Sequence, residues 1–337
     1  LIFRWKDRTR CVKLLLAILN SLLKRCKGQA LKFRFDFFTG KQCSVVSGKC
    51  SYEGSDTMQD LKEIYERLGK LYETDREEMP VLDEFILEYR WFMCADTRGR
   101  VSQCLRVGKE KSPEAYQAVL SKELGKPVDL VIKTFLESGD ETLREPLVAL
   151  LNLMSKPFNT AERLSEQGIV REPGLQFPYD VSGKKVGIIG YGLYNQFFLG
   201  KCKEFHAFDL RPEKGLLNYR IGREGMKIYP EGIHWHLGKS AIDYAEVLKT
   251  LDMVIMTGCT IVNDSYRDIL ACCEKAEVRG IYGPSNELCP AYLFDLGYNY
   301  IFSASVRDKE SYLQAQLAPL PVGEDLKFMD LYILRRK

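Results

Sequence analysis

Residues 185–195 read KVGIIGYGLYN and are the most informative stretch for the fold. The first five residues are an apolar run typical of a buried strand, and glycines follow at positions 190 and 192. Two glycines with this spacing allow a tight turn and a close approach of the backbone to a phosphate group. Asn195 stands where the dinucleotide-binding pattern has its third glycine. The stretch therefore predicts a strand followed by a ligand-binding turn, with an incomplete nucleotide signature.

Beyond this stretch, apolar strand patterns alternate with short helical patterns. The strands are expected at 185–189, 204–209, 252–257, 278–282 and 299–303. Such alternation is typical of a parallel sheet with helices on both faces. We therefore predict an α/β fold with a Rossmann-like sheet, whose ligands bind in the loops at the carboxyl ends of the strands.

The part of the chain before this sheet has a different pattern. Two strands are expected at 85–95 and 101–107, joined by a turn at 96–99, among helices at 60–74, 113–123, 127–137 and 141–155. This mixture predicts a smaller α+β domain. The predicted division is a basic extension at 1–55 (helix 10–27, strand 32–38), the α+β domain at 56–170, the Rossmann-like domain at 171–323 and a C-terminal segment at 324–337.

Charge is concentrated near the start of the sequence. Residues 1–34 hold ten Lys or Arg against one acidic residue, Asp7, whereas the whole chain has a net charge of +3. A basic arm can bind a polyanion or an acidic partner, or it can dock on the acidic remainder of the chain. The net charge does not favour nucleic acid, and a partner-binding role of the arm stays an alternative.

Hydropathy and cysteine usage predict a cytoplasmic protein without a membrane segment. The longest apolar stretch, 12–23, is interrupted by polar residues, and a membrane helix needs about 20 apolar residues. The eleven cysteines are odd in number and scattered, with no C-x-x-C motif, as in a reduced protein. A homo-oligomer stays open.

The end of the second expected strand adds to the nucleotide signature. Asp209 lies 19 positions after Gly190 (209 − 190), where dinucleotide-binding proteins place the acidic residue that binds the ribose. Only about a dozen residues separate Gly192 from the strand at 204–209, so the helix between them is expected to have two turns. A short helix is a poor cradle for a pyrophosphate. A nucleotide cofactor of the NAD or S-adenosylmethionine type is therefore the weaker alternative.

Several motifs between residues 186 and 313 are shared with one known family. They are GIIG at 187–190, FDLRP at 208–212, DMVIMTGCTIVN at 252–263, GPSNELCP at 283–290 and FDLG at 294–297. In these motifs the chain resembles the putative heavy-metal-chelation family, whose members join an enolase-N-terminal-like domain to a Rossmann-like domain. The resemblance implies this fold and an interdomain cleft, and it points to metal chelation or the biosynthesis of a metallo-cofactor or metabolite.

Three loops of the expected sheet carry the candidate ligand-binding residues. The first loop is the glycine turn, the second is 257–263 and the third is the rigid turn at 283–285. The second loop precedes a helix expected at 265–273, which could begin with a capping box of Ser265 and Asp268. Helix N-termini at these loops would favour an anion, although ordinary capping is an alternative use of the same groups. The candidates are Gly190, Tyr191, Gly192, Asp209, Arg211, Thr257, Thr260, Asn263, Gly283, Pro284 and Ser285.

Four residues are candidate metal ligands: Cys259, Cys289, His234 and His236. The cysteines follow two strands that should be neighbours, and a thiolate at a helix N-terminus has a lowered pKa and binds soft metals. The two histidines lie two positions apart, so they share a face of an extended segment. The alternatives are small residues in tight loops and incidental surface histidines, while His206 is expected to be a core residue with partners.

The sequence thus predicts a protein that binds a small anionic or metal-bearing ligand between its domains. A divalent transition metal is the favoured cofactor and a nucleotide the alternative, and a non-catalytic partner-binding protein is the third hypothesis. Whether the chain is catalytic stays open.

Overall fold

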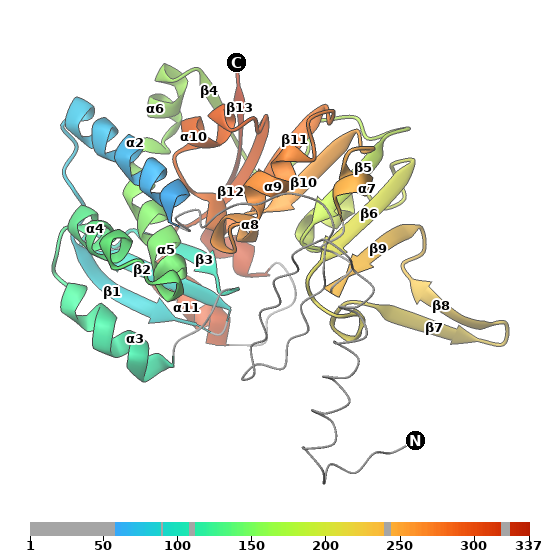
Figure 1. Cartoon of the computed structure of the whole chain (residues 1–337), viewed down its shortest axis with the longest axis horizontal. Helices are drawn as coiled ribbons and strands as arrows, with labels where there is room; N and C mark the ends of the chain where they lie inside the picture. Colours follow the sequence, from blue (N-terminus) through green and yellow to red (C-terminus); the bar gives the residue numbers. More distant parts are fainter. Residues whose placement is uncertain (1–57, 89, 108–111, 239–243, 318–323) are drawn as a thin grey trace, which may run out of the picture. The chain divides into compact units, whose positions relative to one another are not determined.

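The apolar runs form the middle of an eight-stranded sheet with the order β4-β13-β12-β11-β10-β5-β6-β9 (Figure 1). The structure is a computed structural model that describes residues 58–88, 90–107, 112–238, 244–317 and 324–337. The helix and strand predicted at 10–27 and 32–38 lie outside these residues. The strands of the sheet are β4 (Ile169–Pro173), β5 (Lys185–Ile189), β6 (Glu204–Asp209), β9 (Ile233–Leu237), β10 (Met253–Thr257), β11 (Val278–Tyr282), β12 (Tyr300–Val306) and β13 (Met329–Arg336).

Six of these strands are parallel, from β12 to β9, and β13 runs antiparallel between β12 and β4. Numbered along the chain, the parallel strands lie in the order 6-5-4-1-2-3, which is the order of doubly wound α/β sheets. The predicted α/β class is confirmed. The point at which the strand order reverses lies between β5 and β10.

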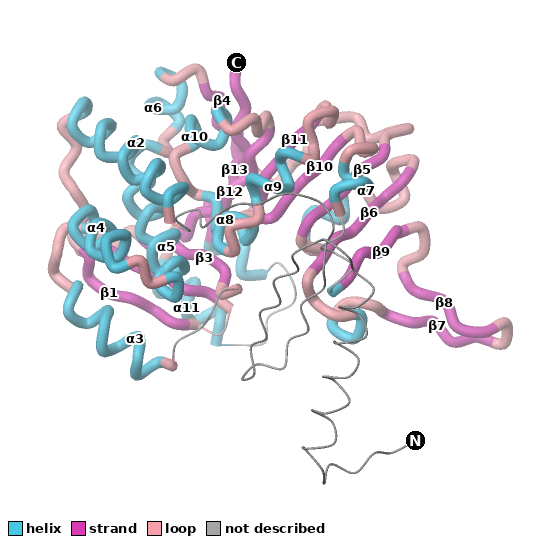
Figure 2. Tube along the Cα trace, viewed as in Figure 1, coloured by secondary structure: helices cyan, strands magenta, loops and turns pink. Residues whose placement is uncertain are grey.

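Short segments cover the two faces of the sheet. They are α7 (Ala245–Leu248), α8 (Cys259–Val262), α9 (Tyr266–Ala271), α10 (Pro290–Asp295) and α11 (Lys309–Leu317). The hairpin β7 (Asn218–Gly222) and β8 (Gly225–Tyr229) forms a separate two-stranded sheet that stands apart from the large one (Figure 2).

The preceding part of the chain is a three-stranded antiparallel sheet packed against helices. Its elements are α2 (Gln59–Asp75), β1 (Leu82–Leu87), β2 (Trp91–Asp96), β3 (Val101–Leu105), α3 (Pro113–Leu120), α4 (Val128–Ser138), α5 (Arg144–Ser155) and α6 (Ala161–Glu166). The single strand predicted at 85–95 is wrong, because the Glu88 carboxylate accepts hydrogen bonds from the amides of Arg90 (2.8 Å) and Trp91 (3.2 Å). These bonds stabilise a reversal between β1 and β2.

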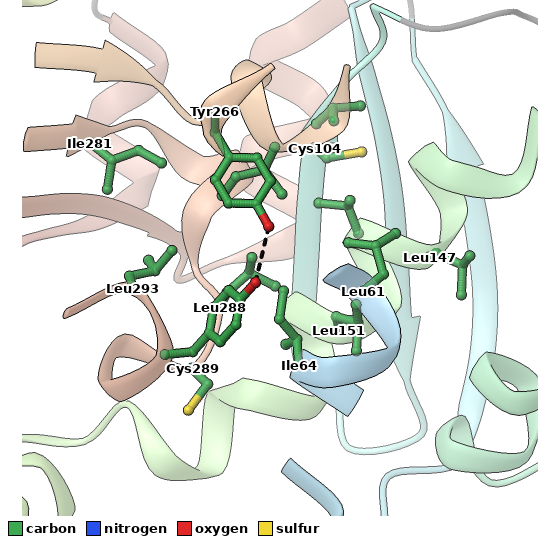
Figure 3. Close-up of a cluster of buried hydrophobic side chains, with 14 of the residues drawn as sticks. Leu61, Ile64, Cys104, Leu147, Leu151, Tyr266, Ile281, Leu288, Cys289 and Leu293 are labelled. Carbon is green, nitrogen blue, oxygen red and sulfur yellow. Dashed lines mark hydrogen bonds between the residues drawn. The ribbon is translucent and has the colours of Figure 1, made fainter. Parts of the chain in front are cut away.

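One hydrophobic core is shared by the two parts. It contains Leu61 and Ile64 of α2, Leu147 and Leu151 of α5, and Ile281 of β11 (Figure 3). Side chains at alternate positions of the large sheet, such as Val254 and Met256, point into this core, while Met253 and Ile255 point into the second core. The smaller α+β part therefore packs directly on the large sheet, and its Met93, Ala95 and Val101 belong to the second core.

A buried ion pair reinforces this joint. Arg144 of α5 donates to the two carboxylate oxygens of Asp60 on α2 at 3.0 and 2.6 Å, and both side chains are under 10% exposed. The same guanidinium donates to the Ile261 carbonyl at the end of α8. Three segments far apart in the sequence are thereby tied together at one point.

Among the described residues, no helix is long and apolar enough to cross a membrane.

Candidate functional site

The glycine turn after β5 is held closed by its own neighbours. Gly190 has a positive φ of 85°, and a Cβ added there would lie 2.6 Å from Cγ2 of Thr257. Its amide donates to the Phe208 carbonyl at 2.8 Å, and its carbonyl accepts a hydrogen bond from the Tyr282 hydroxyl. Doubly wound sheets open a ligand crevice where the strand order reverses. In this chain the side chains of Thr257 and Tyr282 lie against the glycine turn at the point where the strand order reverses.

The second glycine of the turn is conformationally ordinary. Gly192 has φ −163°, which any residue adopts, and an added Cβ would meet only the Tyr282 hydroxyl at 3.5 Å. The shape of the turn therefore does not require a glycine at position 192. The steric requirement lies at Gly190 alone.

The Asp209 carboxylate, predicted to bind a ribose, is fully engaged within the chain. It accepts hydrogen bonds from the amides of Tyr191 and Arg211, both at 2.9 Å. It also accepts from Nε (3.0 Å) and Nη2 (2.7 Å) of the Arg211 side chain. These four bonds use the lone-pair capacity of one carboxylate. A ribose hydroxyl would have to displace one of them.

The segment after Gly192 is a 3-10 helix, Leu193–Phe197, in place of the predicted two-turn α-helix. Its Tyr194 is buried and stacks on Tyr282 with ring centroids 4.7 Å apart. A 3-10 turn does not provide the row of aligned amides with which an α-helix N-terminus binds phosphate. The sequence alone could not show this, because it depends on the aromatic packing beneath the turn.

The loop at 257–263 is also closed by internal bonds. The Thr260 hydroxyl donates to the Thr257 carbonyl at 2.8 Å, and Asn263 Oδ1 accepts from the hydroxyl of Ser265 at 2.7 Å. The predicted capping box of Ser265 and Asp268 is wrong, since α9 has no side-chain cap bond. The Ser265 hydroxyl is already committed to Asn263.

The turn at 283–285 joins the two parts of the protein. Gly283 has φ 116°, the Pro284 carbonyl accepts from Nδ2 of Asn152 at 3.4 Å, and the Ser285 hydroxyl accepts from the Leu105 amide at 2.9 Å. Leu105 ends β3 and Asn152 belongs to α5. Gly283, Pro284 and Ser285 therefore hold the joint.

The two cysteines have separate surroundings. Cys259 Sγ accepts a hydrogen bond from the Thr257 hydroxyl at 3.2 Å, whereas Cys289 lies in the shared hydrophobic core beside Leu288 and Leu293 (Figure 3). Burial raises the pKa of Cys259 to about 11, and it also raises the pKa of Cys289. The expectation of lowered thiol pKa values is wrong, because loss of hydration outweighs the pull of a one-turn helix.

The two predicted histidine ligands lie on β9, at one edge of the large sheet, and a third histidine joins them. His206 of β6 is the ladder partner of His234, and the two rings are stacked with centroids 4.6 Å apart. His206 Nδ1 lies 3.2 Å from His236 Nε2. The chain has three histidines in all, and the fold gathers them on one face of two neighbouring strands.

The surroundings of His206 and His236 favour neutral imidazoles. Burial lowers the pKa of His206, and the charges of His234 and His236 lower it further, while Glu204 acts in the opposite direction. The pKa of His236 is lowered by burial and then by His234. The Glu204 carboxylate lies 3.7 Å from His206 Nε2, on the ring edge away from His236. A carboxylate behind a histidine is the arrangement that orients imidazoles in many metal sites.

The described residues contain no group of three or more His, Cys, Asp or Glu side chains placed to hold a metal ion together. The cluster therefore offers a pair of facing nitrogens, on His206 and His236. His206 was expected to be an ordinary core residue, and only the pairing of β6 with β9 reveals its neighbours. Cys259 and Cys289 lie elsewhere, so the structure does not gather the four predicted metal ligands.

These features define an α/β protein with a doubly wound sheet, a closed glycine turn and a histidine pair at the sheet edge. Residues 179–316 match the model of the family DUF364, described as putative heavy-metal chelation. The resemblance predicted from the sequence is confirmed, and the matched range includes all three histidines.

Solved structures share the fold. A protein of unknown function from the DUF364 family, from Pyrococcus horikoshii, has a TM-score of 0.57 and 18% identity, covering 81% of this chain and 98% of that one. Another, from Desulfitobacterium hafniense, has a TM-score of 0.55 and 17% identity, covering 82% and 98%. No curated protein matches the chain.

Proposed function

We propose that this protein binds a divalent transition metal, brought in by a small ligand, at the nitrogens of His206 and His236. The observation that carries the proposal is their separation of 3.2 Å. With metal–nitrogen bonds of about 2.05 Å, two nitrogens at this distance subtend an angle of roughly 103° at the metal, close to the tetrahedral angle. The pair thus already has the spacing of two ligands of one ion.

The protonation state supports the same role. A histidine binds metal only as the neutral imidazole, so protons compete with the ion. The lowered pKa values of His206 and His236 reduce that competition at neutral pH. Glu204, behind His206, would fix the tautomer that leaves Nδ1 free for the metal.

The remaining coordination positions are proposed to come from the incoming ligand or from water. Two protein ligands suffice to hold a metal that retains its own chelator, whereas a structural zinc site needs four. The description of the matched family as heavy-metal chelation supports this assignment. It favours handling of a metal-bearing small molecule over a structural ion.

The test uses the untagged chain and zinc chloride as the probe. Because the chain has three histidines, all in this cluster, an NMR spectrum of ¹⁵N-labelled imidazoles contains three rings from the protein. Zinc is expected to shift the ring-nitrogen signals of His206 and His236. In competition with a chelator, His206→Ala and His236→Ala are each expected to weaken binding at least about tenfold.

The matched control is the double variant Cys259→Ser with Cys289→Ser, which should bind zinc within about twofold of wild type. Loss of binding in the cysteine variant with retention in both histidine variants would replace this proposal by a thiolate site. Unchanged imidazole signals at saturating zinc would end it outright.

A further inference from the structure

We propose that the hairpin β7–β8 is a dimerisation surface, whose apolar face packs against the same face of a second copy of this chain. The hairpin stands apart from the large sheet, and every residue of its two strands is exposed (Figure 2). A two-stranded hairpin without further packing is at best marginally stable in water. The hairpin is therefore expected to gain stability from a partner that covers it.

The register of the hairpin separates its side chains into two faces of different character. One face holds two apolar cross-strand pairs, Tyr219 with Ile228 and Ile221 with Met226. The opposite face holds two polar pairs, Asn218 with Tyr229 and Arg220 with Lys227. This assignment follows because paired residues share a face and successive residues alternate between faces. The guanidinium carbon of Arg220 accordingly lies 5.4 Å from the centroid of the Tyr229 ring.

The apolar face is open to solvent. Its side chains are exposed by 82% at Ile221, 64% at Met226, 42% at Tyr219 and 38% at Ile228. These fractions amount to roughly 400 Å² of surface, in the range of the apolar patches that often mark an interaction site. Two such patches in contact bury about 800 Å², which is less than a stable complex needs. The dimer is therefore expected to be weak and to form in proportion to protein concentration.

A second copy is favoured because this face has no better match on the chain than itself. In the described part of the chain nine large apolar residues are exposed, and four of them form this face. No other helix or strand in that part presents more than one, apart from Tyr229 on the polar face of the same hairpin. A dimer with twofold symmetry needs only one patch per chain, because the same residues face each other across the axis.

The charges of the hairpin are placed to permit this contact. Arg220 and Lys227 project from the polar face, and the turn between the strands carries one charge of each sign, on Arg223 and Glu224. When two apolar faces meet, the cations of the two copies stay on the outer sides of a sandwich whose sheets lie about 10 Å apart. An anionic lipid surface laid on the apolar face would not meet Arg220 or Lys227. The charge placement therefore favours a second copy over a membrane.

The first experiment is sedimentation of the chain from about 1 μM to 1 mM, the range in which weak complexes dissociate. The average mass is expected to rise with concentration toward that of two chains. A metal chelator is present throughout, so that a metal ion bridging the histidines of two copies cannot contribute. The result is thus independent of the proposed metal site. A mass that stays at one chain over the whole range overturns the proposal, and binding of this monomer to anionic phospholipid vesicles would replace the second copy by a lipid surface.

Two matched double variants localise the contact. Ile221→Ser with Met226→Ser removes one cross-strand pair of the apolar face and should raise the dissociation constant of the dimer at least about tenfold. Arg220→Ser with Lys227→Ser makes the same change in the neighbouring pair of the opposite face and should leave the constant within about threefold. Both pairs are exposed, so neither variant creates a cavity in a core. Equal effects of the two variants, or a larger effect of the second, overturn the assignment to the apolar face.

A spectroscopic readout follows one side chain of the face directly. The chain has eight methionines, so a spectrum of ¹³C-labelled methionine methyl groups contains few signals, and the variant that lacks Met226 identifies that signal. The Met226 methyl signal is expected to shift with protein concentration in wild type and in the Arg220→Ser, Lys227→Ser variant. A Met226 signal that does not move while the sedimenting mass doubles would place the dimer contact elsewhere and overturn the proposal.

Discussion

Replacing Gly190 by alanine tests whether the glycine turn is held by sterics at one position. An L-residue at φ 85° costs about 1–2 kcal/mol. The new Cβ would also lie 2.6 Å from Cγ2 and 2.9 Å from Cβ of Thr257, and such overpacking costs about 1–3 kcal/mol. The expected loss in the free energy of unfolding is the sum, about 2–5 kcal/mol. At about 2 °C per kcal/mol for a protein of this size, the melting temperature should fall by roughly 4–10 °C.

The assay is thermal unfolding of Gly190→Ala beside Gly192→Ala. The second change adds a Cβ at an extended φ with one ordinary contact, so its stability should stay within about 1 kcal/mol of wild type. Thr257→Ser removes the nearest methyl group and should restore part of the loss in Gly190→Ala, but not the backbone strain. Equal destabilisation by the two alanine variants would refute this reasoning.

Three further outcomes follow from buried groups. Arg144→Met leaves the Asp60 carboxylate buried without its ion-pair partner and should lower the free energy of unfolding by about 3–5 kcal/mol, measured by urea titration. The double variant with Asp60→Leu should recover much of the loss. The unfolded chain protonates its histidines near pH 6.5, above the lowered folded pKa of His206. The contribution of this residue to stability should therefore be constant above pH 7 and fall as the pH drops below about 6.5. Denaturant midpoints of wild type and His206→Gln, measured from pH 5 to 8, should accordingly converge or cross as the pH falls. Gly280→Ala places a Cβ 2.6 Å from a neighbouring core side chain, and circular dichroism melting should show a loss of about 1–3 kcal/mol.

Local pattern was sufficient for the parallel strands. The predicted strands at 185–189, 204–209 and 278–282 coincide with β5, β6 and β11, because each is a short apolar run between turn residues. Pattern failed at 85–95, where one carboxylate stabilises a reversal inside an otherwise continuous run. Hydrogen bonds from backbone amides to a nearby side chain are local interactions, but whether they form depends on the rotamer that the packing selects.

The candidate ligand residues show a different limit. Gly190, Asp209 and Thr257 have the residue types of a phosphate and ribose site, and the fold does bring their loops together. Sequence spacing cannot show that Arg211 and Tyr282 already satisfy the polar groups of the turn. A motif states which groups are present, whereas binding depends on which of them remain free after folding.

The histidine pair depends on topology in a still stronger way. His206 and His236 are 30 positions apart, and between them the chain makes the hairpin β7–β8 instead of the helix that usually connects parallel strands. The register of β6 against β9 then decides the geometry: His206 faces His234 across the ladder, which sets His236 diagonally from His206. A shift of one residue would turn both β9 histidines to the other face of the sheet. Among the described residues β9 is an end of the strand order, so it has one neighbouring strand in the sheet, β6. Two histidines on neighbouring strands become a candidate metal-binding pair because of the edge position and the register together. The motif and the spacing alone would not make them one.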